Sequence, residues 1–301
     1  MKHKFFLSLL LALFPLFLLA QLPVTRNSTK PKAKPKTEQA AKPSSAKKTS
    51  QPAKPNNGQR SNAASTSASN AKLNLKNLTS NMVYVSGGTF TMGATSEQGS
   101  DADSDEKPTH SVTVSGFYIC KYEVTQALWK AVMGNNPSNW KGDNLPVEQV
   151  SWDDCQTFIR KLNALTGKNF RLPTEAEWEF AARGGNNSRG YKYAGSNIIG
   201  DVAWYGDNSG SKTHVVGTKS PNELGIYDMS GNVWEWCQDW KGSYSSASQT
   251  NPTGASSGSY RVLRGGSCRS IARFCRSSNR GNRVPAYRDS NNGLRLVLSQ
   301  L

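Results

Sequence analysis

The stretch 225–236, GIYDMSGNVWEW, is the part of the sequence richest in side chains that could hold a ligand. It combines two glycines, two tryptophans and the carboxylates Asp228 and Glu235. Glycine allows backbone conformations with positive φ, and aspartate can hydrogen-bond to its own turn. Tryptophan buries a large area and so fixes a loop against a core. We therefore expect an ordered turn in the middle of a domain, with the carboxylates of Asp228 and Glu235 free to bind a ligand.

Cysteine is the second residue type that could do chemistry. The chain has five, and because this number is odd, at least one thiol is free or pairs outside the chain. None forms a CxxC pair, and only three histidines are present, so a zinc site of the Cys/His type has no support. Cys155 recurs with Trp152, Phe158/Ile159 and Leu162 at helical spacing, which favours a buried core residue over a reactive thiol.

Short elements must position these residues. Thr125 is expected to cap a helix that ends near Gly134. Ser151 is expected to cap a helix over 152–166, with Gly167 as its stop. Thr174-Glu175-Ala176-Glu177 is a capping box that opens a third helix, which Gly184-Gly185 ends. Strands are predicted at 82–85, 89–92, 111–114, 117–120, 260–263 and 294–297, with Gly87-Gly88 as a hairpin turn between the first two.

The charge is concentrated in one part of the chain. The net charge is +16, and residues 21–80 hold 12 Lys or Arg against a single acid, Glu38. This Lys/Pro/Ser/Ala-rich segment has few large apolar side chains, so we predict a disordered linker. Residues 1–20 resemble a signal peptide. We therefore predict a secreted or periplasmic (cell-envelope) protein that has no membrane span after cleavage of the signal peptide. An exported chain rarely meets nucleic acid, so we expect no nucleic-acid partner, and residues 81–301 form one domain.

Several stretches together resemble the formylglycine-generating enzyme, or sulfatase-modifying factor, family. The motifs are VYVSGGTFTMG (83–93), YEVTQ (122–126), PVEQVSWDD (146–154), RLPTEAEWEFAARGG (171–185), NELGIYDMSGNVWEW (222–236) and RVLRGGS (261–267). The resemblance covers essentially residues 82–299. It implies an α+β fold: a single compact domain with a C-type-lectin-like core, low regular secondary structure, short strands and two or three short helices.

The resemblance also implies a calcium ion at residues 225–236. Carried over by position, Asp228 and Glu235 would give side-chain oxygens, and Gly231 and Val233 would give backbone carbonyls. Hard oxygen ligands from a tight turn suit calcium. The alternative is that Asp228 caps a turn and Glu235 pairs with an arginine.

Catalysis is where the sequence departs from the family pattern. Active members oxidise a substrate cysteine to formylglycine with O₂, using two copper-binding cysteines separated by four residues. Here Ser267 is followed by Cys268 and Cys275, which six residues separate, and the histidine and tyrosine of the motif are absent. We therefore predict a non-catalytic module; the alternative is a copper-dependent oxidase that acts on exported sulfatases through Ser267, Cys268 and Cys275.

The C-terminal stretch from Cys268 to Arg295 resembles the ligand-presenting segment of lectin-fold relatives of the enzyme. Its arginines 280, 288 and 295 are expected to form internal salt bridges with carboxylates such as Glu175, Glu177 and Asp239. Surface recognition of a protein or glycan ligand in the cell envelope is assigned to Arg269, Asn279, Asn282, Arg283, Tyr287 and Ser290. A structural role in an envelope machine is the third hypothesis.

Overall fold

The computed structural model describes residues 78–299. The expected signal peptide (1–20) and all but the last three residues of the expected linker (21–80) lie outside the described residues. Residues 78–80 form a helical turn, and Leu78 is 7% exposed and packs in the core. The folded domain therefore includes residues that we assigned to the linker. None of the helices in 78–299 is long and apolar enough to cross a membrane.

The helices begin and end where their capping residues predict. Helix α2 spans Gln126–Met133, with the Thr125 side chain accepting from Leu128 N–H and Gly134 in a left-handed conformation after it. Helix α3 spans Trp152–Thr166 between Ser151 and Gly167, and helix α4 spans Glu175–Ala182 behind Thr174. A further helix, α5 (Ile199–Val202), has no side-chain cap and was not predicted.

Thirteen short strands within residues 78–299 form four small sheets. The first has the order β1-β4-β13-β5, with β1 at Met82–Val85, β4 at Phe117–Cys120, β13 at Val297–Leu298 and β5 at Phe170–Arg171. The second has the order β11-β10-β8-β12, formed by Gly281–Arg283, Arg261–Arg264, Trp234–Trp240 and Asn292–Gly293. The others are β2-β3-β9 (Gly88–Met92, His110–Val114, Gln249–Thr250) and β6-β7 (Ala203–Trp204, Ser230–Gly231).

The hairpin predicted at Gly87-Gly88 is wrong. β1 pairs with β4 and β2 pairs with β3, both antiparallel, so the two glycines carry the chain from one sheet to the next. A Cβ on Gly87 would lie 2.7 Å from the carbonyl oxygen of Val114 on β3. The close approach of β3, rather than a tight turn, therefore requires glycine here.

Two other predictions of secondary structure need correction. Residues 294–296 connect β12 to β13, so most of the strand predicted at 294–297 is irregular. The stretch 225–236 is not only a turn, because Trp234, Glu235 and Trp236 begin β8, the longest strand of the structure. Its three tryptophans favour a strand, and β8 is paired on both edges, with β10 and with β12.

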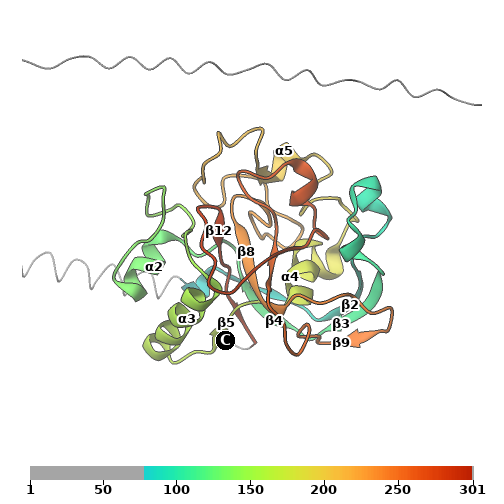
Figure 1. Cartoon of the computed structure of the whole chain (residues 1–301), viewed down its shortest axis with the longest axis horizontal. Coiled ribbons are helices and arrows are strands. Elements are labelled where there is room, and N and C mark those ends of the chain that lie inside the picture. Colours follow the sequence, from blue (N-terminus) through green and yellow to red (C-terminus); the bar gives the residue numbers. More distant parts are fainter. Residues whose placement is uncertain (1–77, 300–301) are drawn as a thin grey trace, which may run out of the picture. The chain divides into compact units, whose positions relative to one another are not determined.

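Strand β8 separates two parts of the core, with α2 and α3 on one side and α4 on the other (Figure 1). Trp236 packs with residues of α2 and α3, such as Phe158, whereas its neighbour Cys237 packs with residues of α4, such as Trp178 and Phe180. Successive residues of a strand point to opposite faces. Glu235, Cys237 and Asp239 therefore all face α4.

Candidate functional site

Glu235 lies in a buried ionic cluster at the start of β8. Its carboxylate accepts from Arg295 Nη2 at 2.6 Å and from Arg295 Nε at 3.0 and 3.1 Å, and Trp178 Nε1 on α4 donates to it at 2.7 Å. The remaining N–H groups of Arg295 donate to the carbonyls of Cys120 and Tyr227. Arg295 and Glu235 are fully buried. The internal salt bridge expected for Arg295 is confirmed, with Glu235 as its partner.

Two further buried carboxyls lie beside this pair, and neither forms an ion pair with a residue of 78–299. Asp228 has a left-handed backbone (φ 60°); its Oδ2 accepts from Gly217 N–H at 2.7 Å, while its Oδ1 has no hydrogen-bond partner among the described residues. Glu123 accepts from Asn232 Nδ2 at 2.6 Å and from Val233 N–H at 3.1 Å. Burial raises the pKa of Asp228 to about 6, and burial with the nearby Asp228 raises the pKa of Glu123 well above its usual value.

The calcium set predicted from the resemblance fits this geometry only in part. The unpaired Oδ1 of Asp228 is suited to a cation, because it is buried and has no hydrogen-bond donor. Glu235 does not fit, because Trp178 and Arg295 already donate to both of its oxygens. Within residues 78–299 no three His, Cys, Asp or Glu side chains converge on a metal-ion position. The calcium ion, and the carbonyls assigned to it at Gly231 and Val233, stay a prediction.

The two cysteines named for the oxidase alternative are both fully buried and free. Burial raises the pKa of Cys268 and of Cys275 to about 12. Cys275 packs with Tyr193 and Val202, and the Ser267 hydroxyl lies 3.2 Å from that of Ser270. Copper(I) binds thiolates, so its binding here would have to remove the protons of two buried thiols. The copper site of the oxidase alternative stays a prediction.

The C-terminal segment places four of its six predicted contact residues at or near the surface. Arg283 is exposed, Arg269 is partly exposed, and Asn282 and Tyr287 are half-buried. Asn279 and Ser290 are not on the surface: they are only 3% and 6% exposed. Asn279 Nδ2 donates to Asp103 and Glu106, which explains why the chain turns it inward.

A surface cavity of about 750 Å³ lies over this segment, and we call it the C-terminal cavity. Arg269, Asn279 and Arg283 of the predicted set line it, together with Trp234 at the start of β8. Ile271 and Phe274 also line it and are 57% and 37% exposed. These three apolar side chains were not predicted as contacts; the only sequence signal was two apolar residues in an otherwise polar segment.

Buried arginine–glutamate pairs hold β10 and the C-terminal segment to the core, and one of their arginines, Arg280, also lines the cavity. Arg280 binds both oxygens of Glu175 at 2.7 Å, Arg276 binds Glu106 at 2.5 Å, and Arg264 binds Glu179 at 2.5 Å. Burial alone would raise the pKa of Glu175 and of Glu106, but Arg280 and Arg276 lower each to about 2. The salt bridge expected for Arg280 is confirmed, with Glu175 as its partner. Of the other two carboxylates expected to pair with these arginines, Glu177 pairs with Arg171, and Asp239 forms no ion pair within residues 78–299. Arg288 pairs instead with Asp154 and is exposed.

The described domain, with short strands, three main helices and a large share of irregular but well-packed chain, is a mixed α+β fold of the C-type-lectin-like class. Two solved structures resemble it. Treponema denticola variable protein 1 superimposes with a TM-score of 0.67 at 35% identity, over 73% of this chain and 95% of that one. PvdO from Pseudomonas aeruginosa superimposes with a TM-score of 0.61 at 28% identity, over 73% of this chain and 94% of that one.

The family follows from the sequence matches. The model of the sulfatase-modifying factor enzyme 1-like domain matches residues 67–300, and the chain belongs to that family. The formylglycine-generating enzyme of Mus musculus is 30% identical over 73% of this chain and 75% of its own length. The chaperone protein LppX of Paenibacillus barcinonensis is 41% identical over 43% of this chain. This chain spans 64% of that chaperone, less than two thirds of its length.

Proposed function

We propose that this protein is an exported, non-catalytic member of its family that binds a protein ligand at the C-terminal cavity. The observation that carries the proposal is the composition of that cavity. It places exposed guanidinium groups beside exposed apolar side chains, next to Arg280, which a buried ion pair with Glu175 holds in place. Arginine and aromatic side chains are the residue types enriched where proteins bind proteins.

Arg283 is the residue of the cavity best placed to recognise a ligand. It makes no ion pair within the described part of the chain; one N–H donates to the Asn282 carbonyl, and the guanidinium lies 5.2 Å from the Tyr287 ring centre. Arg269 is partly exposed and lies 3.8 Å from Asp289, a loose pair. Two carboxylates, Asp103 and Asp105, also line the cavity, but each already pairs with another cation, Arg273 and Lys241 respectively. An acidic side chain of a partner would therefore find the Arg283 guanidinium unpaired, with Ile271 and Phe274 available for apolar contact.

The departure of the cysteine motif from the family pattern supports the absence of oxidase activity. Six residues instead of four separate Cys268 from Cys275, and both thiols are fully buried. The relative that is 41% identical is named a chaperone, and a protein ligand agrees with that name. Export through residues 1–20 belongs to the same proposal, and its test is whether the mature chain is recovered outside the cytoplasm with its first residues removed.

The binding test compares the full chain with the variant R283A on arrays of acidic peptides and of glycans. We expect binding to peptides that carry an acidic residue next to apolar ones, with R283A weakening it at least tenfold. R288A is the matched control, because Arg288 is equally exposed but pairs with Asp154 and does not line the cavity. Binding to glycans alone, or equal losses in R283A and R288A, would contradict a protein ligand at this cavity.

The oxidase alternative has its own test. A Cys-x-Pro-x-Arg peptide is incubated with the protein, copper, a reductant and air, and its mass is followed beside a known formylglycine-generating enzyme. We expect no mass change with this protein while the known enzyme converts the peptide. Conversion that is lost in C268S and in C275S would show that these thiols are catalytic, and would overturn the non-catalytic assignment.

A further inference from the structure

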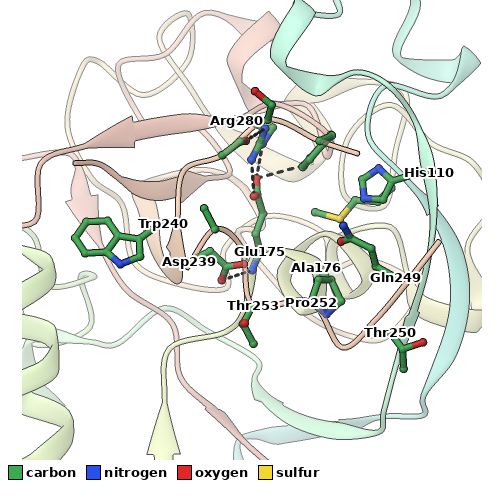
Figure 2. Close-up of a pocket in the computed structure, with 16 residues that line it drawn as sticks. His110, Glu175, Ala176, Asp239, Trp240, Gln249, Thr250, Pro252, Thr253 and Arg280 are labelled. Carbon is green, nitrogen blue, oxygen red and sulfur yellow. Dashed lines mark hydrogen bonds and ion pairs between the residues drawn. The ribbon is translucent and has the colours of Figure 1, made fainter. Parts of the chain in front are cut away.

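A second cavity, of about 540 Å³, opens at the first turn of α4, and we call it the α4 cavity. None of the predicted contact residues lines it, although Arg280 lines both this cavity and the C-terminal one. The rest of its lining comes from α4, the end of β8, Met92 on β2, His110 on β3 and the segment 242–255. In Figure 2, Asp239 and Glu175 lie between Trp240 on one side and His110 with Gln249 on the other. Its volume is within the range typical of small-molecule sites.

Asp239 is the unusual group in this lining. It is 3% exposed, and its one hydrogen bond is from the Glu175 N–H to Oδ2 at 2.9 Å. No arginine, lysine or histidine within residues 78–299 forms an ion pair with it. Buried carboxylates are normally paired, since an uncompensated buried charge is costly. Glu175, its neighbour in the same cavity, follows that rule through Arg280.

The charge of the cavity is therefore decided by Asp239. Glu175 and Arg280 neutralise each other, and Arg280 uses its other N–H groups on the carbonyls of Asp105 and Gly242. Burial raises the pKa of Asp239 to about 8, with Glu175 and Glu177 adding to the effect and Arg280 opposing it. Arg261, on β10, is the other cation whose field reaches Asp239. A ligand that carried a positive charge would supply the missing partner.

Neutral hydrogen-bonding groups and aromatic rings narrow the class of cation. The side chains of Gln249 and Thr253 line the cavity and make no hydrogen bond to the described residues. The rings are already covered by guanidinium groups: Arg261 lies 3.5 Å from the Trp240 ring centre, and Arg280 lies 3.8 Å from that of Tyr244. Open aromatic faces, which quaternary ammonium ions need, are thus scarce, whereas oxygen acceptors are available.

We propose that the α4 cavity is a binding site for a small organic cation with a primary ammonium group, which donates hydrogen bonds to the Asp239 carboxylate. Gln249 and Thr253 offer further oxygen acceptors to the same group or to a second polar end of the ligand. The site is separate from the protein-binding function proposed above, and neither depends on the other.

The experiment titrates the full chain with 1,5-diaminopentane and, as its uncharged match, 1,5-pentanediol, in a calorimeter at pH 8. We expect the diamine to bind and the diol to give no measurable binding. D239N, which keeps the shape and the acceptor for Glu175 N–H, should weaken the diamine at least tenfold. D143N removes the same charge from an exposed carboxylate outside the cavity and should leave binding within twofold of the unaltered protein.

Proton release gives a readout that a merely structural role of Asp239 would not produce. Because the free carboxyl is largely protonated at pH 7, diamine binding there should release close to one proton, measured from the heats in two buffers of different ionisation enthalpy. H110Q removes the other titratable side chain of the lining that could release a proton, and should leave this release unchanged. Q249E, which adds a carboxylate beside the site, should tighten the diamine and tests the proposal even if D239N fails to fold.

Absence of diamine binding up to 20 mM, equal binding of the diol, or binding without proton release at pH 7 would each overturn the proposal. Unchanged affinity in both D239N and Q249E would do so as well.

Discussion

The buried carboxyl groups near the two ends of β8 differ in the partners that they have. Glu235, near its start, receives Arg295 and the Trp178 indole, whereas Asp239, near its end, receives only one backbone N–H. Both side chains face α4, and both are at most 3% exposed. The difference separates structure from function: the paired carboxylate fixes the C-terminal segment to the core, and the unpaired one lines a cavity that can take a ligand.

The largest effect is expected from breaking the paired end. R295M should lower the free energy of unfolding by about 3–5 kcal/mol, because Glu235 would remain buried without a cation. Chemical denaturation followed by tryptophan fluorescence measures it. R288M is the control: its side chain is 53% exposed beside Asp154, so its loss should cost less than about 1 kcal/mol. Similar losses in both variants would show that burial does not distinguish the two pairs.

The unpaired carboxyl of Asp239 should make the free energy of unfolding depend on pH. The folded protein keeps the Asp239 proton up to about pH 8, whereas an unfolded aspartate loses it near pH 4. The folded state thus binds more protons between these values, so stability falls as the pH rises through this window. D239N lacks this titration, and from pH 5 to pH 9 it should lose about 4 kcal/mol less than the unaltered chain, because one extra proton stays bound over about three pH units. Parallel curves would mean that Asp239 has an ordinary pKa.

The smallest effect is expected from calcium. It tests whether the ionic cluster at the start of β8 also binds a metal ion. If Asp228 Oδ1 binds calcium, 1 mM Ca²⁺ should raise the melting temperature by about 2–4 °C relative to a chelator, equivalent to ~1 kcal/mol. D228N should remove the rise, because it removes the charge of the one predicted ligand with a free oxygen. A melting temperature independent of calcium would leave Arg295 as the cation of this cluster.

The sequence predicted local structure well wherever a local interaction decides it. The starts of α2, α3 and α4 were fixed by Thr125, Ser151 and Thr174, whose side chains accept from the first-turn N–H groups. Such capping bonds join residues three positions apart, so the sequence contains all the information they need. Strand pairing joins distant residues, and for that reason the hairpin at Gly87-Gly88 was wrong.

The family and its fold class could be recognised from motifs in the sequence alone, and the motif arginines 280 and 295 were correctly expected to pair inside the protein. The partners and the surfaces were decided by the tertiary structure. Only packing shows that Asn279 and Ser290 are buried, that Ile271 and Phe274 are exposed beside Arg283, and that Asp239 lacks a cation. These properties depend on contacts between side chains that lie far apart in the chain. The spacing of residues along the sequence does not determine such contacts.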